Sequence, residues 1–206
     1  IPIDSELPAE YAELLKAFAR ARSIEDIPGD KDPFWRRYPD FSRGRLEWAR
    51  RALEAGYTAK VLDLLPDSLA PKLSTQELFL FHQLSAQANV QSAHWAQAAH
   101  NYQELYKLRQ DCVSASNLAD CYRYLKDNAN CDKWSQIALK LNPYDARAHL
   151  NQGWLKMQSG DAREAERLLR ESVHICPYLL EAWVELARVL GESNQASQAG
   201  WALRQA

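Results

Sequence analysis

The sequence predicts an all-α protein, a solenoid built from repeated antiparallel helix pairs, and three observations support this prediction. Helix-favouring Ala, Leu, Glu, Arg and Gln are plentiful, whereas the 206 residues include only seven Gly and nine Pro. Two similar proline breaks after apolar stretches, at Pro143 and Pro177, are 34 residues apart. Residues that cap helix starts precede several apolar stretches. Together these features predict helical hairpins that stack along the chain.

Composition narrows the classes of partner. With 47% hydrophobic and 25% charged residues, the chain has the profile of a globular or repeat protein rather than a disordered one. A formal net charge of -2 provides no field that would gather phosphates, so we expect no nucleic acid partner. The longest apolar runs fall far short of the roughly 20 residues that cross a bilayer, which predicts no membrane span.

The four cysteines indicate the cellular compartment in which the protein works. The spacing of Cys112, Cys121, Cys131 and Cys176 matches neither paired metal-ligand motifs nor a small disulfide framework. We therefore expect reduced, partly buried thiols, no metal and a cytoplasmic setting. The chain begins at Ile1 without a basic segment and apolar core, so we expect any targeting signal to lie outside it.

Residues 1–41 are expected to form a helical, partly irregular N-terminal extension. Apolar residues recur at helical spacing in its first part and predict a helix over residues 8–22. The segment from Pro33 to Phe41 packs four aromatics between prolines, and arginines continue as far as Arg51. Two interpretations stay open for this segment: a cap over the exposed end of a solenoid, or a site that stacks on bases or binds an acidic partner.

Residues 42–77 predict a degenerate helical hairpin. The stretches Arg45 to Ala55 and Tyr57 to Leu65 have helical character and flank Gly56. Further along, Ser74 and Glu77 have the Ser-x-x-Glu spacing of a capping box before an apolar run. This box predicts the start of the next helix.

From residue 78 onward the chain repeats. We expect units at 78–111, 112–145 and 146–179, and a truncated unit at 180–206, with Asp127, Asp145 and Asp161 at helix starts. The first of these copies is looser and has Gln110 where the others close with proline. In the three better copies the residues that fit the repeat are, unit by unit, Ala115, Leu118, Ala119, Tyr122, Cys131, Ser135 and Pro143, then Gly153, Gly160, Asp161, Ala165, Leu169 and Pro177, then Trp183, Leu186, Ala187, Leu190, Ala199 and Leu203.

These residues resemble the tetratricopeptide repeat (TPR) pattern W-x2-L-G-x2-Y, A-x3-F, P. The resemblance implies a right-handed superhelix in which the first helix of each pair lines a concave groove. It also implies a protein-binding scaffold or adaptor whose partner is a peptide or another protein. Two alternatives stay open: a substrate-docking or regulatory arm of a larger glycosyltransferase-like or methyltransferase-like enzyme, and an assembly or secretion chaperone.

Helical spacing separates the two faces of each first helix. In the unit from residue 112, Ala115, Leu118 and Tyr122 point one way and a mostly polar set points the other way. Placing that polar set and its counterparts in the groove follows from the resemblance. The predicted groove residues are Asn117, Asp120, Arg123, Tyr124, Arg147, Leu150, Asn151, Trp154, Met157, Gln158, Glu181, Glu185 and Arg188.

Three hypotheses concern this groove. Asn117 and Asn151 are 34 residues apart and resemble rungs of the asparagine ladder of O-GlcNAc transferases, although an Asn there also bonds neighbouring helices. Leu150, Trp154 and Met157 predict an apolar pocket, unless Trp154 packs against the adjacent first helix. The acidic residues of the last unit, Glu181, Glu185 and Glu192 beside Arg188, suggest a basic ligand end.

Two site types are disfavoured. Asn117 and Arg147 match part of the carboxylate clamp of some TPR proteins, but His82, Ala86 and Asn151 stand where its other polar residues belong. The five histidines are scattered, with no recurring nucleophile or carboxylate partner and no Gly-rich phosphate loop. We therefore expect neither a catalytic site nor a cofactor.

Overall fold

A computed structural model describes residues 42–193 and 195–206 of the chain. The predicted helix over 8–22 and the aromatic segment up to Phe41 lie outside these residues. Within them the chain forms helices and no strands, so the prediction of an all-α fold is confirmed. The chain divides into two units, residues 1–84 and 85–206, and the boundary falls inside helix α5.

In the first unit the described elements are α3 (Ser42–Glu54), α4 (Thr58–Leu64), the 3-10 helix η2 (Asp67–Lys72) and the first part of α5 (Thr75–Gln91). Helices α3 and α4 pack together, and Gly56 makes the turn between them with φ +81°. The side chain of Trp48 is completely buried in this unit.

The predicted capping box starts α5. The Glu77 carboxylate accepts a hydrogen bond from the backbone N–H of Ser74 at 3.0 Å, and the Glu77 N–H donates to Ser74 Oγ at 3.4 Å. The other carboxylate oxygen of Glu77 accepts a bond from Ser42 Oγ at 2.6 Å, which ties α3 to the start of α5. These bonds, with the Ser42 bond as the largest cause, lower the pKa of Glu77.

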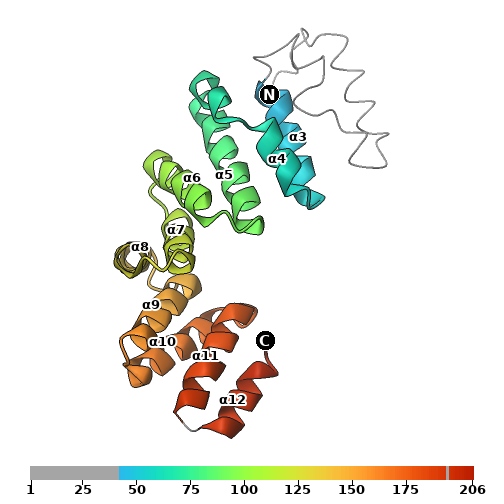
Figure 1. The fold of residues 1–206 in the computed structure, drawn as a ribbon. Helices are drawn as coiled ribbons and strands as arrows, with labels where there is room; N and C mark the ends of the chain where they lie inside the picture. The colour runs from blue at the N-terminus through green and yellow to red at the C-terminus, as the bar shows by residue number, and fades with distance from the viewer. Residues whose placement is uncertain (1–41, 194) are drawn as a thin grey trace. The chain divides into compact units, whose positions relative to one another are not determined.

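In its described residues, the second unit consists of the rest of α5 and seven further helices. Each helix from α6 onward packs against the next, and α9 also packs against both α7 and α11 (Figure 1). Figure 1 shows these helices following one another from green to red. They are α6 (Trp95–Leu108), α7 (Cys112–Tyr124), α8 (Asn128–Leu141), α9 (Ala146–Gln158), α10 (Ala162–Ile175), α11 (Leu180–Glu192) and α12 (Ala196–Leu203). Stacked hairpins of this kind form a helical repeat solenoid.

Aspartate side chains cap four helix starts in this unit. The predicted caps Asp127, Asp145 and Asp161 each accept a hydrogen bond from the backbone N–H three residues later. Asp111, which the sequence analysis did not single out, caps α7 in the same way at 2.7 Å. Such caps satisfy backbone donors that the helix leaves free, and each contributes about 1 kcal/mol.

The turns after α7 and α9 share one backbone conformation. Lys126 has φ 59° and Gly160 has φ 80°, and the two positions are 34 residues apart. After each turn the next N–H bonds back to a carbonyl five residues earlier, Asp127 to Tyr122 and Asp161 to Lys156, at 2.9 Å in both cases. Glycine adopts this left-handed conformation freely, whereas a lysine there is strained.

The core of the C-terminal half joins α9, α10, α11 and α12 around Leu150, Leu169 and Leu186, among other residues. Gly153 allows α9 and α10 to approach closely, because a Cβ atom added there would lie 2.8 Å from Cγ of Leu169. Polar residues on another side of α9 reach α8, where Gln152 donates to the Asp132 carboxylate at 2.9 Å.

Candidate functional site

A small cavity lies among the first helices of the pairs, α7, α9 and α11, and its volume is about 70 Å³. Five of the residues that line it were predicted as groove residues: Asn117, Asp120, Tyr124, Arg147 and Glu181. Sequence reasoning did not place four others there: Val90 of α5, Trp95 and Tyr102 of α6, and Cys121 of α7. The cavity therefore draws side chains from five helices of the second unit.

Asp120 is the centre of a buried ion-pair network. Its Oδ2 accepts a hydrogen bond from Arg147 Nη1 of α9 at 2.6 Å, and its Oδ1 accepts from Arg123 Nη2 at 3.3 Å. Asp120 is 6% exposed and Arg123 is 7% exposed. Two guanidinium groups thus hold one carboxylate in fixed geometry beside the cavity.

Arg123 extends the network from α7 to two more helices. Its Nε donates to Asn151 Oδ1 of α9 at 2.8 Å, and its Nη2 lies 3.5 Å from Glu181 Oε2 of α11. The guanidinium group also lies over the ring of Tyr124, 4.4 Å from the ring centre. The hydroxyl group of Tyr124 donates to Glu181 Oε1 at 2.9 Å. This single arginine therefore connects the first helices of three successive pairs.

One wall of the cavity is aromatic. Trp95, the first residue of α6, stacks on Tyr124, with ring centres 4.0 Å apart and planes 7° from parallel. Tyr124 remains partly exposed, so the stacked pair presents apolar surface beside the polar network. Stacked pairs of this kind are rigid and suit contact with an apolar or planar group of a ligand.

Burial and neighbouring charges shift the pKa values of several groups in the site. Burial alone would lower the pKa of the Arg123 guanidinium, but the neighbouring charges, led by Asp120, outweigh it and raise that pKa. The pKa of Arg147 is raised for the same reasons. Burial, followed by the Asp120 charge, raises the pKa of the Cys121 thiol to about 12, so this cysteine is not a thiolate nucleophile at neutral pH. The arrangement offers fixed hydrogen-bonding groups rather than reactive ones.

The two predicted rungs, Asn117 and Asn151, have different environments. Asn117 is half-buried, lines the cavity and has no side-chain hydrogen bond within the described ranges. Asn151 is completely buried, and its carbonyl oxygen accepts the bond from Arg123. For Asn151 the structure supports the interpretation that it bonds a neighbouring helix, and only Asn117 is open to a ligand.

The apolar side of α9 corrects one prediction. Leu150 was expected in the groove, but it is 0% exposed and belongs to the core between α9 and the following helices. Met157 is partly buried and packs against the same core. Trp154 is half-buried, and Gln158 at the end of the helix is exposed. The predicted pocket of Leu150, Trp154 and Met157 therefore lacks Leu150.

The acidic residues of α11 are largely engaged with other groups. Glu181 faces α7 and accepts bonds from Tyr124 and Arg123. Glu185 accepts two hydrogen bonds from the Arg188 guanidinium, at 3.0 and 2.8 Å. Glu192 is exposed at the helix end. Because two of the three carboxylates already have cationic partners, the expected preference for a basic ligand loses most of its support.

The cysteines, the possible metal ligands and the helix lengths of the described residues bear on other types of site. The four cysteines are free, with Cys121 and Cys131 buried and Cys112 and Cys176 half-buried. Residues 42–193 and 195–206 contain no cluster of three His, Cys, Asp or Glu side chains arranged for a metal ion. None of the helices in these ranges is long and apolar enough to cross a membrane.

Comparison with known proteins gives structural matches only. No family model matches the sequence, and no curated protein matches it. The structure is similar to MamA from Desulfovibrio magneticus RS-1 at TM-score 0.62 and 14% identity, over 80% of this chain and 92% of that one. It is also similar to TTC0263, a thermophilic TPR protein of Thermus thermophilus, at TM-score 0.60 and 18% identity, over 80% and 91% of the two chains.

A third structure has a functional description. YrrB, described as a TPR protein with an unusual peptide-binding site, matches at TM-score 0.58 and 13% identity, over 83% of this chain and 87% of YrrB. Identities this low carry the fold and not the function. With its stacked helical hairpins and the 34-residue spacing of its turns, the chain has the fold of a tetratricopeptide repeat solenoid.

Proposed function

We propose that this chain is a protein-interaction scaffold that binds a peptide or protein segment over the cavity between α6, α7, α9 and α11. The observation that supports this proposal best is the pre-formed network around Asp120, which fixes Arg147 and the Tyr124 ring before any ligand arrives. A site held in its binding geometry loses less conformational entropy on association, so more of the contact energy appears as affinity.

The lining groups suit a peptide backbone. The Asn117 amide has a donor and an acceptor available, and both match the groups of an extended main chain. The Trp95 and Tyr124 rings lie beside it and offer apolar contact for a neighbouring side chain. A cavity of about 70 Å³ has room for a small group, not for a whole ligand, which agrees with a peptide that lies across the mouth.

The two alternative roles would also begin with binding of a protein segment. A docking arm of a larger enzyme and an assembly chaperone would each need the solenoid to hold a segment of another protein. The peptide-binding description of YrrB supports binding in a solenoid of this fold, since the two structures align over most of both chains.

A peptide selection tests the proposal. The protein is immobilised and presented with a phage library of random 12-residue peptides, and enriched peptides are synthesised and titrated calorimetrically. We expect Asn117→Ala to weaken binding about threefold to tenfold, the effect of one or two neutral hydrogen bonds. Asn128→Ala is the matched control, because Asn128 is an exposed asparagine on α8.

Two outcomes would count against this function. A library that yields no enriched peptide in repeated selections would contradict peptide binding. Equal affinity of the wild type and Asn117→Ala for every enriched peptide would move the binding site away from this cavity.

A further inference from the structure

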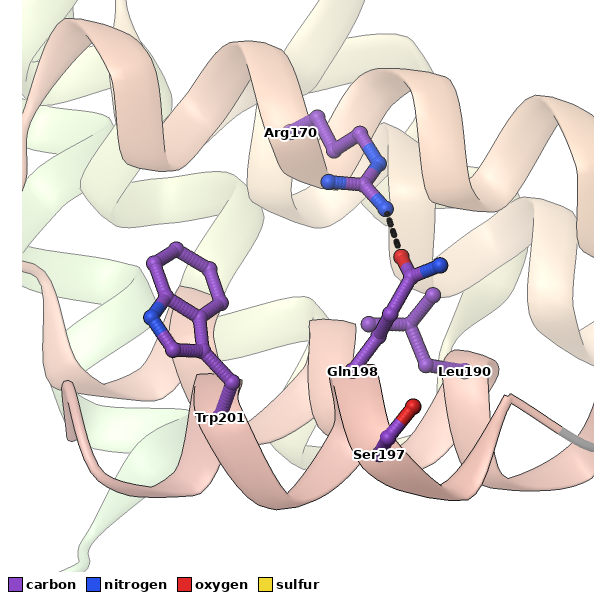
Figure 2. A pocket seen from close by; sticks show the side chains of 5 residues that line it. All are labelled: Arg170, Leu190, Ser197, Gln198 and Trp201. Atoms are coloured by element: carbon purple, nitrogen blue, oxygen red, sulfur yellow. Dashed lines mark hydrogen bonds between the residues drawn. The ribbon is translucent and has the colours of Figure 1, made fainter.

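Two neighbouring hollows lie between α10, α11 and α12, away from the cavity described above. One has a volume of about 300 Å³ and is lined by Arg170, Leu190, Ser197, Gln198 and Trp201 (Figure 2). The other has a volume of about 320 Å³ and is lined by Arg170, Val173, His174, Pro177, Trp183, Leu186 and Trp201. Both hollows have Arg170 and Trp201 in their lining, and we name the two together the Trp201 cleft.

Two tryptophans form the apolar part of the Trp201 cleft. Trp183 is buried, and its indole N–H donates to the carbonyl oxygen of Pro177 at 2.8 Å, which fixes the ring. Trp201 meets it edge to face, with ring centres 5.4 Å apart and an interplanar angle of 81°. Even so, Trp201 remains 46% exposed. A large indole supported from below and open above has the anatomy of a binding hot spot.

Arg170 forms the polar part of the Trp201 cleft. Its Nε donates to Glu166 Oε1 at 2.8 Å, and its Nη2 donates to Gln198 Oε1 at 2.9 Å. In Figure 2 the guanidinium group reaches from α10 toward α12, where Gln198 meets it, with the Trp201 indole on the other side of the hollow. Nη1 has no hydrogen bond within residues 42–193 and 195–206. It is therefore available to an acceptor on a ligand.

The acidic partner of Arg170, Glu166, lies outside the lining of the Trp201 cleft. In the described chain no carboxylate lines either hollow, and the titratable groups that do are Arg170 and His174. The nearest acid in the network, Glu166, binds Arg170 through Nε and Gln195 through its other oxygen at 3.3 Å. A ligand carboxylate would thus meet an oriented guanidinium donor, and no carboxylate that lines the hollows would repel it.

From this geometry we infer that the Trp201 cleft binds a peptide segment of a partner protein in which an acidic residue stands close to an aromatic or large aliphatic residue. The carboxylate bonds to Arg170 Nη1, and the apolar side chain packs on the Trp201 indole. Hollows of about 300 Å³ are at the lower end of the volumes of ligand sites and suit one side chain each. This site shares no residue with the cavity around Asp120 and does not depend on the function proposed there.

Synthetic peptides test the Trp201 cleft directly. The probes are Gly/Ser peptides of ten residues with one Glu and one Phe placed one to three residues apart, with Gln-for-Glu and Ala-for-Phe versions as controls. Binding to the full chain is followed by the indole N–H signal of Trp201 in nitrogen-15 NMR spectra, assigned from Trp201→Phe. For at least one spacing we expect the Glu/Phe peptide to shift this signal and to bind about two- to fivefold more tightly than its Gln version, because the Arg170 side chain is partly exposed.

Two substitutions on α10 form a matched pair. Arg170→Gln should remove the preference for Glu over Gln, whereas Arg167→Gln should keep it. Arg167 is also exposed and pairs with a carboxylate three residues earlier, Glu164 at 2.7 Å, but it lines neither hollow. Spectra of both variants without peptide report whether the fold is retained.

Three results would overturn the inference. The first is equal binding of the Glu and Gln peptides to the wild type at every spacing, and the second is an equal effect of Arg170→Gln and Arg167→Gln. The third is self-association: if sedimentation shows dimers that Trp201→Ala dissociates, the Trp201 cleft is an interface between two copies of this chain.

Discussion

Helices α7 and α9 hold equivalent places in successive repeats, yet they use equivalent positions in opposite ways. On α7, Asn117 lines a cavity and Asp120 organises an ion-pair network. On α9, the residues 34 positions later are Asn151, which is completely buried, and Trp154, which is half-buried. Helix α7 has part of its polar face on the cavity, whereas α9 uses much of the equivalent face for contact with its neighbours.

The difference shows that position within a repeat does not by itself decide exposure. Helix α9 packs against the first helices on both sides, α7 and α11, and Arg123 reaches across to bond Asn151. The same residue type therefore lines a cavity in one repeat and is buried in a contact between helices in the next. Four pairs of substitutions test this comparison.

The largest effect is expected for Asp120→Ala on α7. The change removes the buried carboxylate of Asp120 and leaves Arg123 with only the more exposed Glu181 at 3.5 Å; breaking a buried pair in this way costs about 3–5 kcal/mol of unfolding free energy. Urea denaturation measures it. Glu185→Ala, which removes a more exposed pair on α11, should cost less than about 1 kcal/mol. Similar losses for both variants would show that the network does not stabilise the fold.

Leu150→Ala on α9 is expected to lower the free energy of unfolding by about 2–5 kcal/mol, because Leu150 is completely buried in the core. Val113→Ala on α7 should change it by less than about 0.5 kcal/mol, since Val113 is 59% exposed. Both are read from urea midpoints. If Leu150→Ala were as mild as its control, Leu150 would belong to the groove after all.

At one packed position the two helices differ by a single methyl group. Gly153 of α9 corresponds to the buried Ala119 of α7, and Gly153→Ala would bring a Cβ within 2.8 Å of Leu169. We expect a loss of about 1–3 kcal/mol from overpacking, measured by thermal or urea unfolding. Gly191→Ala is the control: it lies on a helix with open space around it and should stabilise the protein by about 0.5–1 kcal/mol. A stabilising Gly153→Ala would mean that α9 and α10 can separate at no cost.

The smallest effect concerns the turns that end the two helices. Lys126→Gly should raise the free energy of unfolding by about 1 kcal/mol, because glycine adopts φ 59° without strain. The reciprocal change Gly160→Lys in the turn after α9 should lower it by a similar amount. Differential scanning calorimetry of both variants checks the signs. Two changes of the same sign would show that the turns are not equivalent.

Local signals in the sequence predicted much of the fold. The aspartate caps and the capping box at Ser74 involve residues three apart, so the sequence contains both partners of each bond. The 34-residue spacing likewise marks equivalent turns. These features depend on short stretches of chain and hardly at all on the tertiary contacts between helices.

The candidate site was predicted only in part, because it depends on contacts between distant helices. Helical spacing put Asn117, Asp120 and Tyr124 on one face, and all three line the cavity. Trp95 was missed as a site residue because nothing in its local pattern shows that it stacks on a ring 29 positions later. Leu150 was misplaced because α9 has apolar residues on more than one side, and only the packed neighbours decide which side is covered.

The bonds from Tyr124 and Arg123 to Glu181 join α7 to α11 and pass over the hairpin between them. In most solenoids each repeat contacts only its neighbours, so a stretched array can peel open from its end, one hairpin at a time. Here the last hairpin is also anchored two repeats back. Pulled from its C-terminus, this part of the chain should resist until the bonds to Glu181 break. It should then unfold cooperatively rather than one hairpin at a time.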